Sequence, residues 1–267
     1  YIVMMGMVAF TACGNKENKE EAIGKSMTEN LPGKWTITKS YEKKDGEWKE
    51  VIEPEGSGTT YLFRTDGSMM SAVTYANHDT YLRSRTWAVE DHDSTLKINY
   101  KTYPVEYTLM RLTADELEFG YDKATDMTTG ATQEGEFKWL FRRIDESQKN
   151  FAERLLGKWH FSKSYEKKNG EWVEISFGLP NEGWYLYRED GSFTVYSRNG
   201  EDEKTSDMNW SVNNVTGELR WVNKDGQSSE VNVVIEEDGT LSVFYLYNLD
   251  PSTGQAITGE FKDVLIR

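Results

Sequence analysis

The chain contains the same sequence pattern twice. Gly33-Lys34-Trp35 matches Gly157-Lys158-Trp159, and KSYEKKDGEW at residues 39–48 matches KSYEKKNGEW at residues 163–172 at nine of ten positions. Farther along, GEFK at residues 135–138 matches GEFK at residues 259–262. Such long segments indicate a duplicated domain, because the units of a solenoid repeat every 20 to 45 residues or so. Whatever fold the repeated unit has, the chain must form it twice.

The repeat also sets the domain boundaries. We assign the first copy to residues 31–145, the second copy to residues 155–267 and the linker to residues 146–154, whose sequence ESQKNFAER can form a helical turn. Each copy has the size of an ordinary small domain, about 100 residues or more. Two separate cores are therefore expected.

Both copies begin with a strand-like alternation. Large side chains alternate with smaller polar ones, at Trp35, Ile37, Lys39 and Tyr41 in the first copy and at Trp159, Phe161, Lys163 and Tyr165 in the second. A period of two residues is the pattern of a β-strand with one buried face. It predicts that each set of four side chains shares one face of its strand.

Turn residues divide each copy into many short runs. Asp-Gly pairs at residues 45–46, 66–67 and 238–239 have the composition of tight hairpin turns. Aromatic residues make up 13% of the chain, which suits half-buried pleated surfaces. About eight or nine runs per copy favour an all-β fold in which each copy is a small antiparallel up-and-down barrel.

The N-terminal segment is typical of an exported lipoprotein. Residues 1–10 (YIVMMGMVAF) are apolar and lead through Thr11 and Ala12 to Cys13, the only cysteine in the chain. About ten apolar residues are too few to span a bilayer but match the hydrophobic part of a signal peptide. The pattern resembles a lipobox. This resemblance implies that residues 1–12 belong to a signal peptide that begins upstream, and that acylated Cys13 holds the chain on a membrane.

Residues 13–30 predict a flexible tether. The part after the cysteine (NKENKEEAIGKSMTEN, residues 15–30) has no aromatic residue and many charges, so it buries too little apolar surface to fold. Each buried methylene of an acyl chain contributes about 0.8 kcal/mol, so several chains on Cys13 anchor the protein firmly. Acidic and lysine residues directly after the cysteine resemble export signals of Gram-negative lipoproteins. They imply a location in the cell envelope, at the outer membrane.

Charge and motif content argue against several functions. A formal net charge of −14 argues against binding nucleic acid, which is held by clustered lysine and arginine. We find no convincing nucleophile with a base, metal cluster or phosphate loop, and therefore expect no enzyme, no cofactor and no metal. Asp91-His92-Asp93 and residues 122–126 (DKATD) lack the spacing of a known calcium loop and are interpreted as turns.

The repeated motifs resemble those of lipocalin-like proteins. Gly-x-Trp opens the first strand of each copy, a meander of hairpins follows, and Arg143 and Arg267 close the last strands. The resemblance is closest to lipidated, often tandem, lipocalin-like proteins of Gram-negative gut-type bacteria. It implies that Trp35 and Trp159 plug one end of each barrel and that Arg143, or its neighbour Arg142, and Arg267 lie over them. An arginine over an indole ring contributes about 0.5 to 2 kcal/mol, so this role is structural.

Six residues are candidates for lining a ligand site. They lie at equivalent positions of the two copies, namely Lys39, Tyr61, Phe63, Lys163, Tyr185 and Tyr187. One interpretation has the two lysines reaching into the barrels toward a ligand carboxylate, and the other places them at the rim of a stiff first hairpin. The aromatic residues either line a pocket or simply fill the core, since a small barrel can be filled by its own side chains.

Two hypotheses for function remain open. The first is a non-enzymatic envelope protein that binds a small apolar or amphipathic ligand in its barrels, which requires an internal cavity. The second is a surface-interaction module that contacts a glycan or a protein through exposed aromatic residues such as Trp48 and Trp172. A cavity would favour the first hypothesis and an exposed aromatic patch the second.

Overall fold

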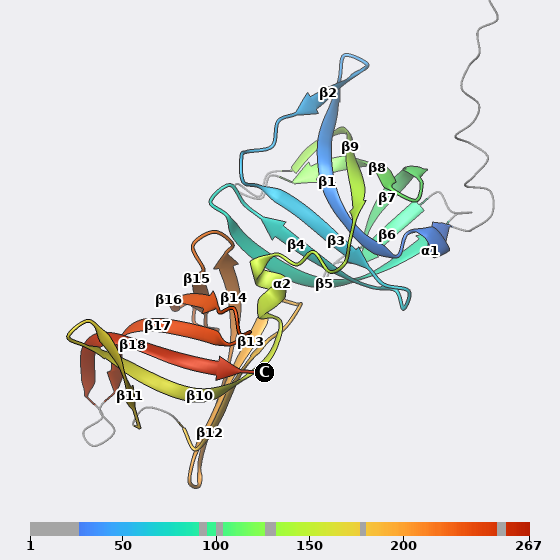
Figure 1. Ribbon diagram of the computed structural model, residues 1–267. Coiled ribbons are helices and arrows are strands. Elements are labelled where there is room, and N and C mark those ends of the chain that lie inside the picture. The colour runs from blue at the N-terminus through green and yellow to red at the C-terminus, as the bar shows by residue number, and fades with distance from the viewer. Residues whose placement is uncertain (1–26, 91–94, 100–103, 126–131, 177–179, 250–254) are drawn as a thin grey trace, which may run out of the picture.

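The computed structural model describes residues 27–90, 95–99, 104–125, 132–176, 180–249 and 255–267. In these residues the protein is built almost entirely of antiparallel β-strands, as the sequence predicts, with nine strands in each copy and two short helices. Figure 1 shows the first copy, coloured blue to green, beside the second copy, coloured yellow to red, with one short helix between them. Cys13 and most of the predicted signal and tether lie outside the described residues.

The first copy closes into an antiparallel barrel of eight strands. Pairing runs from β1 through β3 to β9 in chain order and then returns from β9 to β1, while β2 pairs only with the far end of β1. The strands are β1 (Gly33–Lys44), β2 (Glu47–Val51), β3 (Gly58–Phe63), β4 (Ser68–Thr74), β5 (Asp79–Glu90), β6 (Thr95–Asn99), β7 (Pro104–Leu112), β8 (Glu116–Thr125) and β9 (Thr132–Ile144).

The strand pairings of the second copy follow the same order. β10 pairs with β12, consecutive strands pair up to β18, and β18 pairs with β10. The extra strand β11 lies on the far end of β10, as β2 does on β1. The strands are β10 (Gly157–Lys168), β11 (Glu171–Ile175), β12 (Glu182–Tyr187), β13 (Ser192–Asn199), β14 (Asp202–Asn213), β15 (Glu218–Val222), β16 (Ser228–Ile235), β17 (Leu241–Leu249) and β18 (Ala256–Ile266).

The predicted Asp-Gly turns connect hairpin strands. Asp45 and Gly46 both have positive φ values, 55° and 83°, between β1 and β2. Two positive φ values in succession give a turn whose twist matches that of the strands. Between β3 and β4, the side chain of Asp66 accepts hydrogen bonds from the backbone and hydroxyl of Ser68. The turn chemistry read from the sequence therefore sets the strand order.

A short helix and a tryptophan close one end of each copy. Helix α1 (Met27–Asn30) precedes β1 and helix α2 (Phe151–Leu155) precedes β10, so α1 occupies positions that the sequence assigned to the tether. The indole N–H of Trp35 donates to the carbonyl of Leu31 at 2.8 Å, and the indole N–H of Trp159 donates to the carbonyl of Leu155 at 2.7 Å. Both indoles are almost fully buried.

An arginine from the last strand covers each tryptophan. The guanidinium of Arg143 lies 4.2 Å from the ring centroid of Trp35, and that of Arg267 lies 4.5 Å from the ring centroid of Trp159. Arg143 also donates to the carbonyls of Pro32 and Asn30, and Arg267 to the carbonyl of Arg154. Each arginine thus ties the end of its copy to the segment before its first strand.

A β-bulge changes which side chains of the first strand point inward. The register between β1 and β9 shifts between Ile37 and Lys39, and that between β10 and β18 shifts between Phe161 and Lys163. The extra residue reverses the alternation, because two residues on one strand then oppose one on its partner. As a result Ser40 is buried where the sequence pattern predicted Lys39 and Tyr41 on the inner face.

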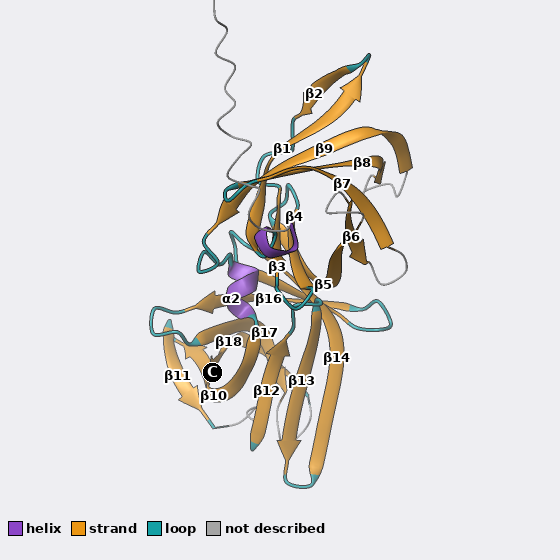
Figure 2. Ribbon diagram, turned by 90° about the vertical axis from the view of Figure 1, so that its right-hand side faces the viewer, coloured by secondary structure: helices purple, strands orange, loops and turns teal. Residues whose placement is uncertain are grey.

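The core of the second copy extends onto the first copy. Met70, Ala72 and Leu82, on the outer face of the first copy, belong to the same buried cluster as Leu155 and Trp210 of the second copy. Figure 2 shows α2 lying between the copies, where β5 of one meets β14 of the other. The interior of the first copy forms a buried cluster of its own, so each copy has the core that the sequence predicts.

Polar contacts fix the same interface. Lys34, at the start of β1, forms an ion pair at 2.8 Å with Glu153 of α2, and both side chains are at most 5% exposed. Glu153 also completes a capping box with Asn150, so the predicted linker contains an ordered helix start. Asn214 donates to the hydroxyl of Thr80, which is fully buried. The linker region is thus part of the packed structure.

Replacing Lys34 tests how much the buried ion pair of this interface contributes to the stability of the protein. We expect Lys34→Ala to lower the free energy of unfolding by about 3 to 5 kcal/mol, because it leaves the buried Glu153 carboxylate without its partner. Lys39→Ala is the matched control, since Lys39 pairs with Glu50 at the exposed surface and such pairs contribute about 1 kcal/mol or less. Urea titration measures both values. Equal and small losses in the two variants would contradict a dominant role for the buried pair.

Candidate functional site

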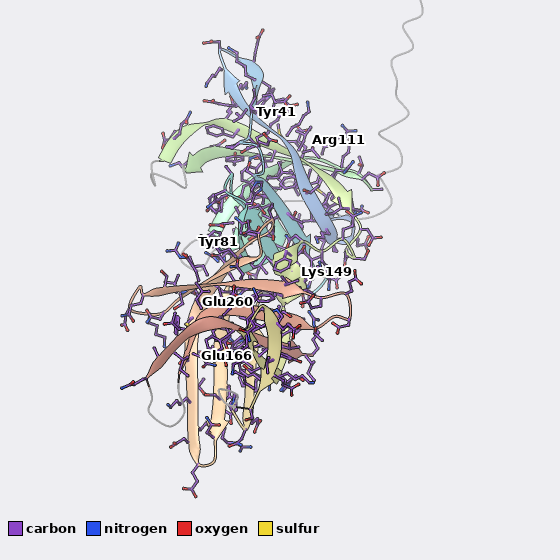
Figure 3. The ribbon with its side chains drawn as sticks, turned by 60° about the vertical axis from the view of Figure 1, so that its left-hand side comes forward. Tyr41, Tyr81, Arg111, Lys149, Glu166 and Glu260 are labelled. Atoms are coloured by element: carbon purple, nitrogen blue, oxygen red, sulfur yellow. The ribbon has the colours of Figure 1, made fainter. Side chains whose placement is uncertain are left out.

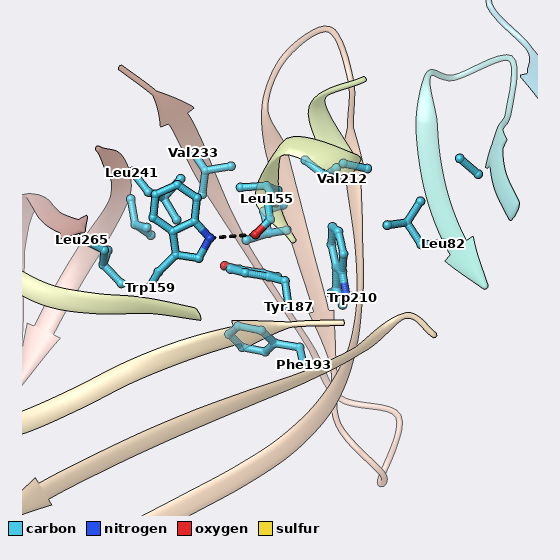
Figure 4. Packing of buried hydrophobic residues seen from close by; sticks show 14 of the residues in the cluster. Leu82, Leu155, Trp159, Tyr187, Phe193, Trp210, Val212, Val233, Leu241 and Leu265 are labelled. Atoms are coloured by element: carbon cyan, nitrogen blue, oxygen red, sulfur yellow. Dashed lines mark hydrogen bonds between the residues drawn. The ribbon is translucent and has the colours of Figure 1, made fainter. Parts of the chain in front are cut away.

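The closed end of the second copy is tightly packed. Figure 4 shows the ring of Tyr187 beside Phe193 and Trp210, with the indole of Trp159 bonded to the carbonyl of Leu155. Ring centroids of Tyr187 and Phe193 are 4.6 Å apart, and those of Tyr187 and Trp210 are 5.1 Å apart. All these side chains are at most 3% exposed. This end of the interior is core.

The next layer of the same interior is less completely buried. Its inward-facing side chains are packed against the core cluster yet remain partly exposed, and they include Phe161, Tyr185, Val195, Met208, Trp221 and Val231. They lie farther from the floor formed by Trp159, toward the end where β10 carries β11. Because these inner side chains keep some exposure, this layer is the candidate binding site.

Asp263 is the charged residue of this layer. It lies on β18 between Phe261 and Leu265, both fully buried, and pairs in register with Val243 of β17 and Ser164 of β10. Its Oδ1 atom accepts hydrogen bonds from the hydroxyls of Ser164 at 2.6 Å and Tyr245 at 2.9 Å. Burial raises the pKa of the Asp263 carboxyl, and these two hydrogen bonds oppose part of the rise. A carboxylate on an inner apolar face is costly unless something compensates its charge.

Aromatic side chains surround this carboxylate. The rings of Tyr245 and Phe261 stack 5.6 Å apart next to Asp263, and the ring of Phe161 meets Tyr185 at 4.8 Å. Burial raises the pKa of the Tyr185 hydroxyl, and the charge of nearby Asp263 raises it further. The site therefore combines one acid with several ring faces.

Two buried polar groups near the site face each other. They are the hydroxyl of Tyr187, a residue 1% exposed, and the indole N–H of Trp221. Burial and the neighbouring Tyr185 raise the pKa of Tyr187 well above its ordinary value, while the indole N–H of Trp221 opposes the rise. This pair links the packed end of the interior to the next layer.

The first copy fills the equivalent layer. Trp139 stands where the second copy has Asp263, with its ring centroid 4.6 Å from that of Tyr121 and 5.7 Å from that of Phe119. Ser40, the counterpart of Ser164, is buried and its hydroxyl has no partner among the described residues. The counterparts of Tyr185 and Trp221, which are Tyr61 and Ile98, are almost fully buried. A tryptophan thus occupies the space that the second copy leaves to a carboxylate.

The lysines proposed as ligand partners lie outside both interiors. Lys39 pairs with Glu50 at 2.9 Å and Lys163 pairs with Glu174 at 3.0 Å, and each side chain is about half exposed. The β-bulge in each first strand turns them outward. Of the two interpretations left open by the sequence, the structure supports lysines on a stiff hairpin.

The proposed aromatic residues do face the interiors. In the first copy, Tyr61 and Phe63 meet edge to face at 5.9 Å and are buried in its core. In the second copy, Tyr187 lies in the packed end and Tyr185 lies one layer farther out, in the candidate site. Of these four, only Tyr185 lies in the partly exposed layer.

Trp48 and Trp172 lie on the projecting hairpins and are partly covered by lysines. Lys43 and Lys138 approach the ring of Trp48 at 5.7 Å and 4.8 Å, and Lys138 also lies over Tyr41, which Figure 3 labels on this arm. Trp172 is partly covered in the same way, by two lysines of the second copy. These contacts give the repeated KSYEKKxGEW window a structural role in stiffening the hairpin.

Other kinds of site receive little support from the described residues. In that part of the chain, no three His, Cys, Asp or Glu side chains gather as metal ligands, and Asp91-His92-Asp93 lies outside it. No described helix is both long and apolar enough to cross a membrane. A wide-open cleft between the copies is bordered by Ser84, Arg188 and Glu189, and Glu189 is paired there with Arg64.

The residues that define the site were not singled out in the sequence. Asp263 interrupts an inward-facing apolar series on the last strand, and comparison with Trp139 of the first copy would have exposed the interruption. Ser164 and Tyr245 carried no such signal. They come together with Asp263 only when β10, β17 and β18 pair.

Comparisons with known proteins give only distant similarity. No protein-family model and no curated protein matches the chain. A lipocalin-like protein from Bacteroides uniformis ATCC 8492 is 16% identical with a TM-score of 0.30, covering 43% of this chain and 99% of that one. A protein of unknown function of the DUF3598 family from Nostoc punctiforme PCC 73102 is 9% identical with a TM-score of 0.26, covering 91% and 99%. These scores are too low to support an argument about function.

Asp263→Asn tests the cost of the buried carboxylate. The pKa of Asp263 is higher in the folded chain than in the unfolded chain, so the folded chain keeps the proton to a higher pH. The free energy of unfolding therefore falls as the pH rises from the unfolded-state pKa through the folded-state pKa. The asparagine has no charge and keeps an oxygen for Ser164 and Tyr245. We therefore expect the variant to gain stability over wild type as the pH rises above about 4, by about 1.4 kcal/mol per unit of pKa elevation. Urea titrations at several pH values measure this, and parallel pH profiles for the two proteins would contradict it.

Proposed function

We propose that the protein is a non-enzymatic, lipid-anchored binding protein of the cell envelope, made of two tandem lipocalin-like barrels. In this proposal the second barrel binds a small amphipathic ligand and the first barrel is structural. The observation that carries the proposal is the partly exposed inner layer around Asp263 in the second copy. The same layer of the first copy is filled by Trp139.

The chemistry of the layer fits binding better than catalysis. Asp263 is the acidic group of the site, and its described neighbours are hydroxyls and aromatic rings, without a nucleophile activated by a base. Small-molecule sites are mostly apolar pockets with a few placed polar groups. The site has this composition.

The packing of the second copy's core against the outer face of the first copy supports a division of roles. Leu82 of the first copy packs into the cluster that includes Trp210 and Val212 of the second. The filled first barrel therefore supports the wall of the second. A rigid scaffold lowers the cost of ordering a binding site.

The membrane anchor rests on the lipobox resemblance around Cys13. The segments on either side of Cys13 differ sharply, apolar before it and charged after it. In the proposal the acylated cysteine holds the chain at the outer membrane, and the tether lets both barrels stand in the aqueous phase.

Native mass spectrometry tests the binding function. The mature chain with Cys13→Ser, incubated with an extract of its own cell envelope and purified again gently, is expected to carry one small molecule per chain. Asp263→Trp, which places the tryptophan of the first copy in the second, should lose the passenger, whereas Trp139→Phe in the first copy should keep it. Near-ultraviolet circular dichroism checks that each variant is folded. A bare wild-type mass, or a passenger retained by folded Asp263→Trp, would count against the proposal.

Metabolic labelling tests the anchor separately. The complete precursor, expressed in a Gram-negative host with radioactive palmitate, is expected to incorporate label and to sediment with membranes. Cys13→Ser should abolish the incorporation, because the acyl chains are attached through this cysteine. Unlabelled wild-type protein, or equal labelling of the variant, would overturn the anchor without bearing on the ligand site.

A further inference from the structure

The Asp263 carboxylate has no cationic partner in the described protein. No described lysine or arginine forms an ion pair with it, and the two hydrogen bonds that it accepts come from neutral hydroxyls on the same oxygen, Oδ1. Glu166, the nearest acidic residue along β10, lies two positions after Ser164 and is paired with Lys168. The negative charge of the inner wall is therefore available to a ligand.

The surroundings of this charge suit a cation. The aromatic side chains of Tyr245, Phe261 and Tyr185 lie near the carboxylate, and the negative face of an aromatic ring attracts an ammonium group when water is excluded. An ammonium group has three donors and no acceptor. It can donate to the Oδ2 atom of Asp263, which accepts no hydrogen bond from the described residues, and an anionic head group cannot do this.

The size of the apolar layer limits the ligand body. Below it, Tyr187, Phe193 and Trp210 fill the closed end. Ser206 and Ser229, which pair in register with Val195 and Trp221, are exposed, so the wall becomes polar toward solvent. An aromatic ring or a short aliphatic chain, about as long as this single layer of side chains, therefore fits here better than a long acyl chain.

We infer that the ligand of the second barrel is a small amphipathic amine, with its ammonium group on Asp263 and its apolar body against Phe161, Tyr185 and Trp221. This inference rests on the proposed function and deepens it. The second barrel selects the ligand by charge as well as by shape. The first barrel, with Trp139 in the corresponding place, has no such selectivity.

A matched set of three probes tests the inference. 2-Phenylethylamine, 2-phenylethanol and 3-phenylpropanoate have similar bodies and carry a positive, a neutral and a negative head group. Isothermal titration calorimetry of the mature chain with Cys13→Ser at pH 7 is expected to give one amine site per chain. The amine should bind at least tenfold more tightly than the alcohol, because hydrogen bonds to charged groups are the stronger ones. The carboxylate should bind most weakly.

Two variants separate the parts of the inference. Asp263→Asn should weaken amine binding by about 10- to 100-fold and abolish the preference over the alcohol, while changing alcohol binding by less than about threefold. Asp263→Trp should abolish binding of all three probes. Trp139→Phe, in the first barrel, should leave all three affinities unchanged.

The outcomes are distinguishable. If amine and alcohol bind equally to wild type, or if Asp263→Asn keeps the amine preference, the amine inference is overturned. In that case the proposed binding function still stands if the alcohol binds one-to-one to wild type and Asp263→Trp abolishes this binding. If no probe binds to the wild type and its native mass is bare, both are overturned. Tighter binding of 3-phenylpropanoate than of 2-phenylethylamine would also overturn the inference, because the site would then prefer a negative charge.

Discussion

The closure of each copy by a buried tryptophan is the interaction on which the rest of the structure depends. The indole is held between a backbone carbonyl of the preceding helix and the guanidinium of the last strand, in the pairs Trp35 with Arg143 and Trp159 with Arg267. It links the beginning of each copy to its end, which a barrel needs if its last strand is to pair with its first. Because this end is sealed by packed rings, any access to the interior must come from the other end.

Duplication allowed the two copies to use the same plan differently. Lys34 forms the buried ion pair that joins the copies, whereas its counterpart Lys158 lies over the ring of Trp184 at 4.2 Å. Trp139 fills the first interior, whereas Asp263 leaves the second with a charge and an aromatic lining. Neither exchange alters a strand pairing. Changes confined to side chains thus give the two interiors different chemistry on one backbone plan.

Fold and site were predictable to different degrees. Periodicity of two, Asp-Gly turns and the offset between copies predicted an all-β chain and its strand order, because these features act over a few residues. The prediction that Lys39 and Lys163 share a strand face with Trp35 and Trp159 was wrong, since a single extra residue in a strand reverses every later side chain and leaves no trace in the pattern. The site around Asp263 was missed for a related reason: its members lie about 20 to 100 residues apart in the chain.

The sequence by itself determined the duplication, the strand periodicity and the turn positions, and its resemblance to lipocalin-like proteins implied the pairing of each Gly-x-Trp with a closing arginine. It also carries the lipobox-like segment around Cys13 on which the anchor proposal rests. Only the tertiary structure decided which side chains face inward past the bulges, that the core of the second copy extends onto the outer face of the first, and that Asp263, Ser164 and Tyr245 meet. The physical reason is that local propensities depend on residues that are neighbours in the sequence. Burial and charge environment depend instead on contacts between distant residues, which form only when the strands pair.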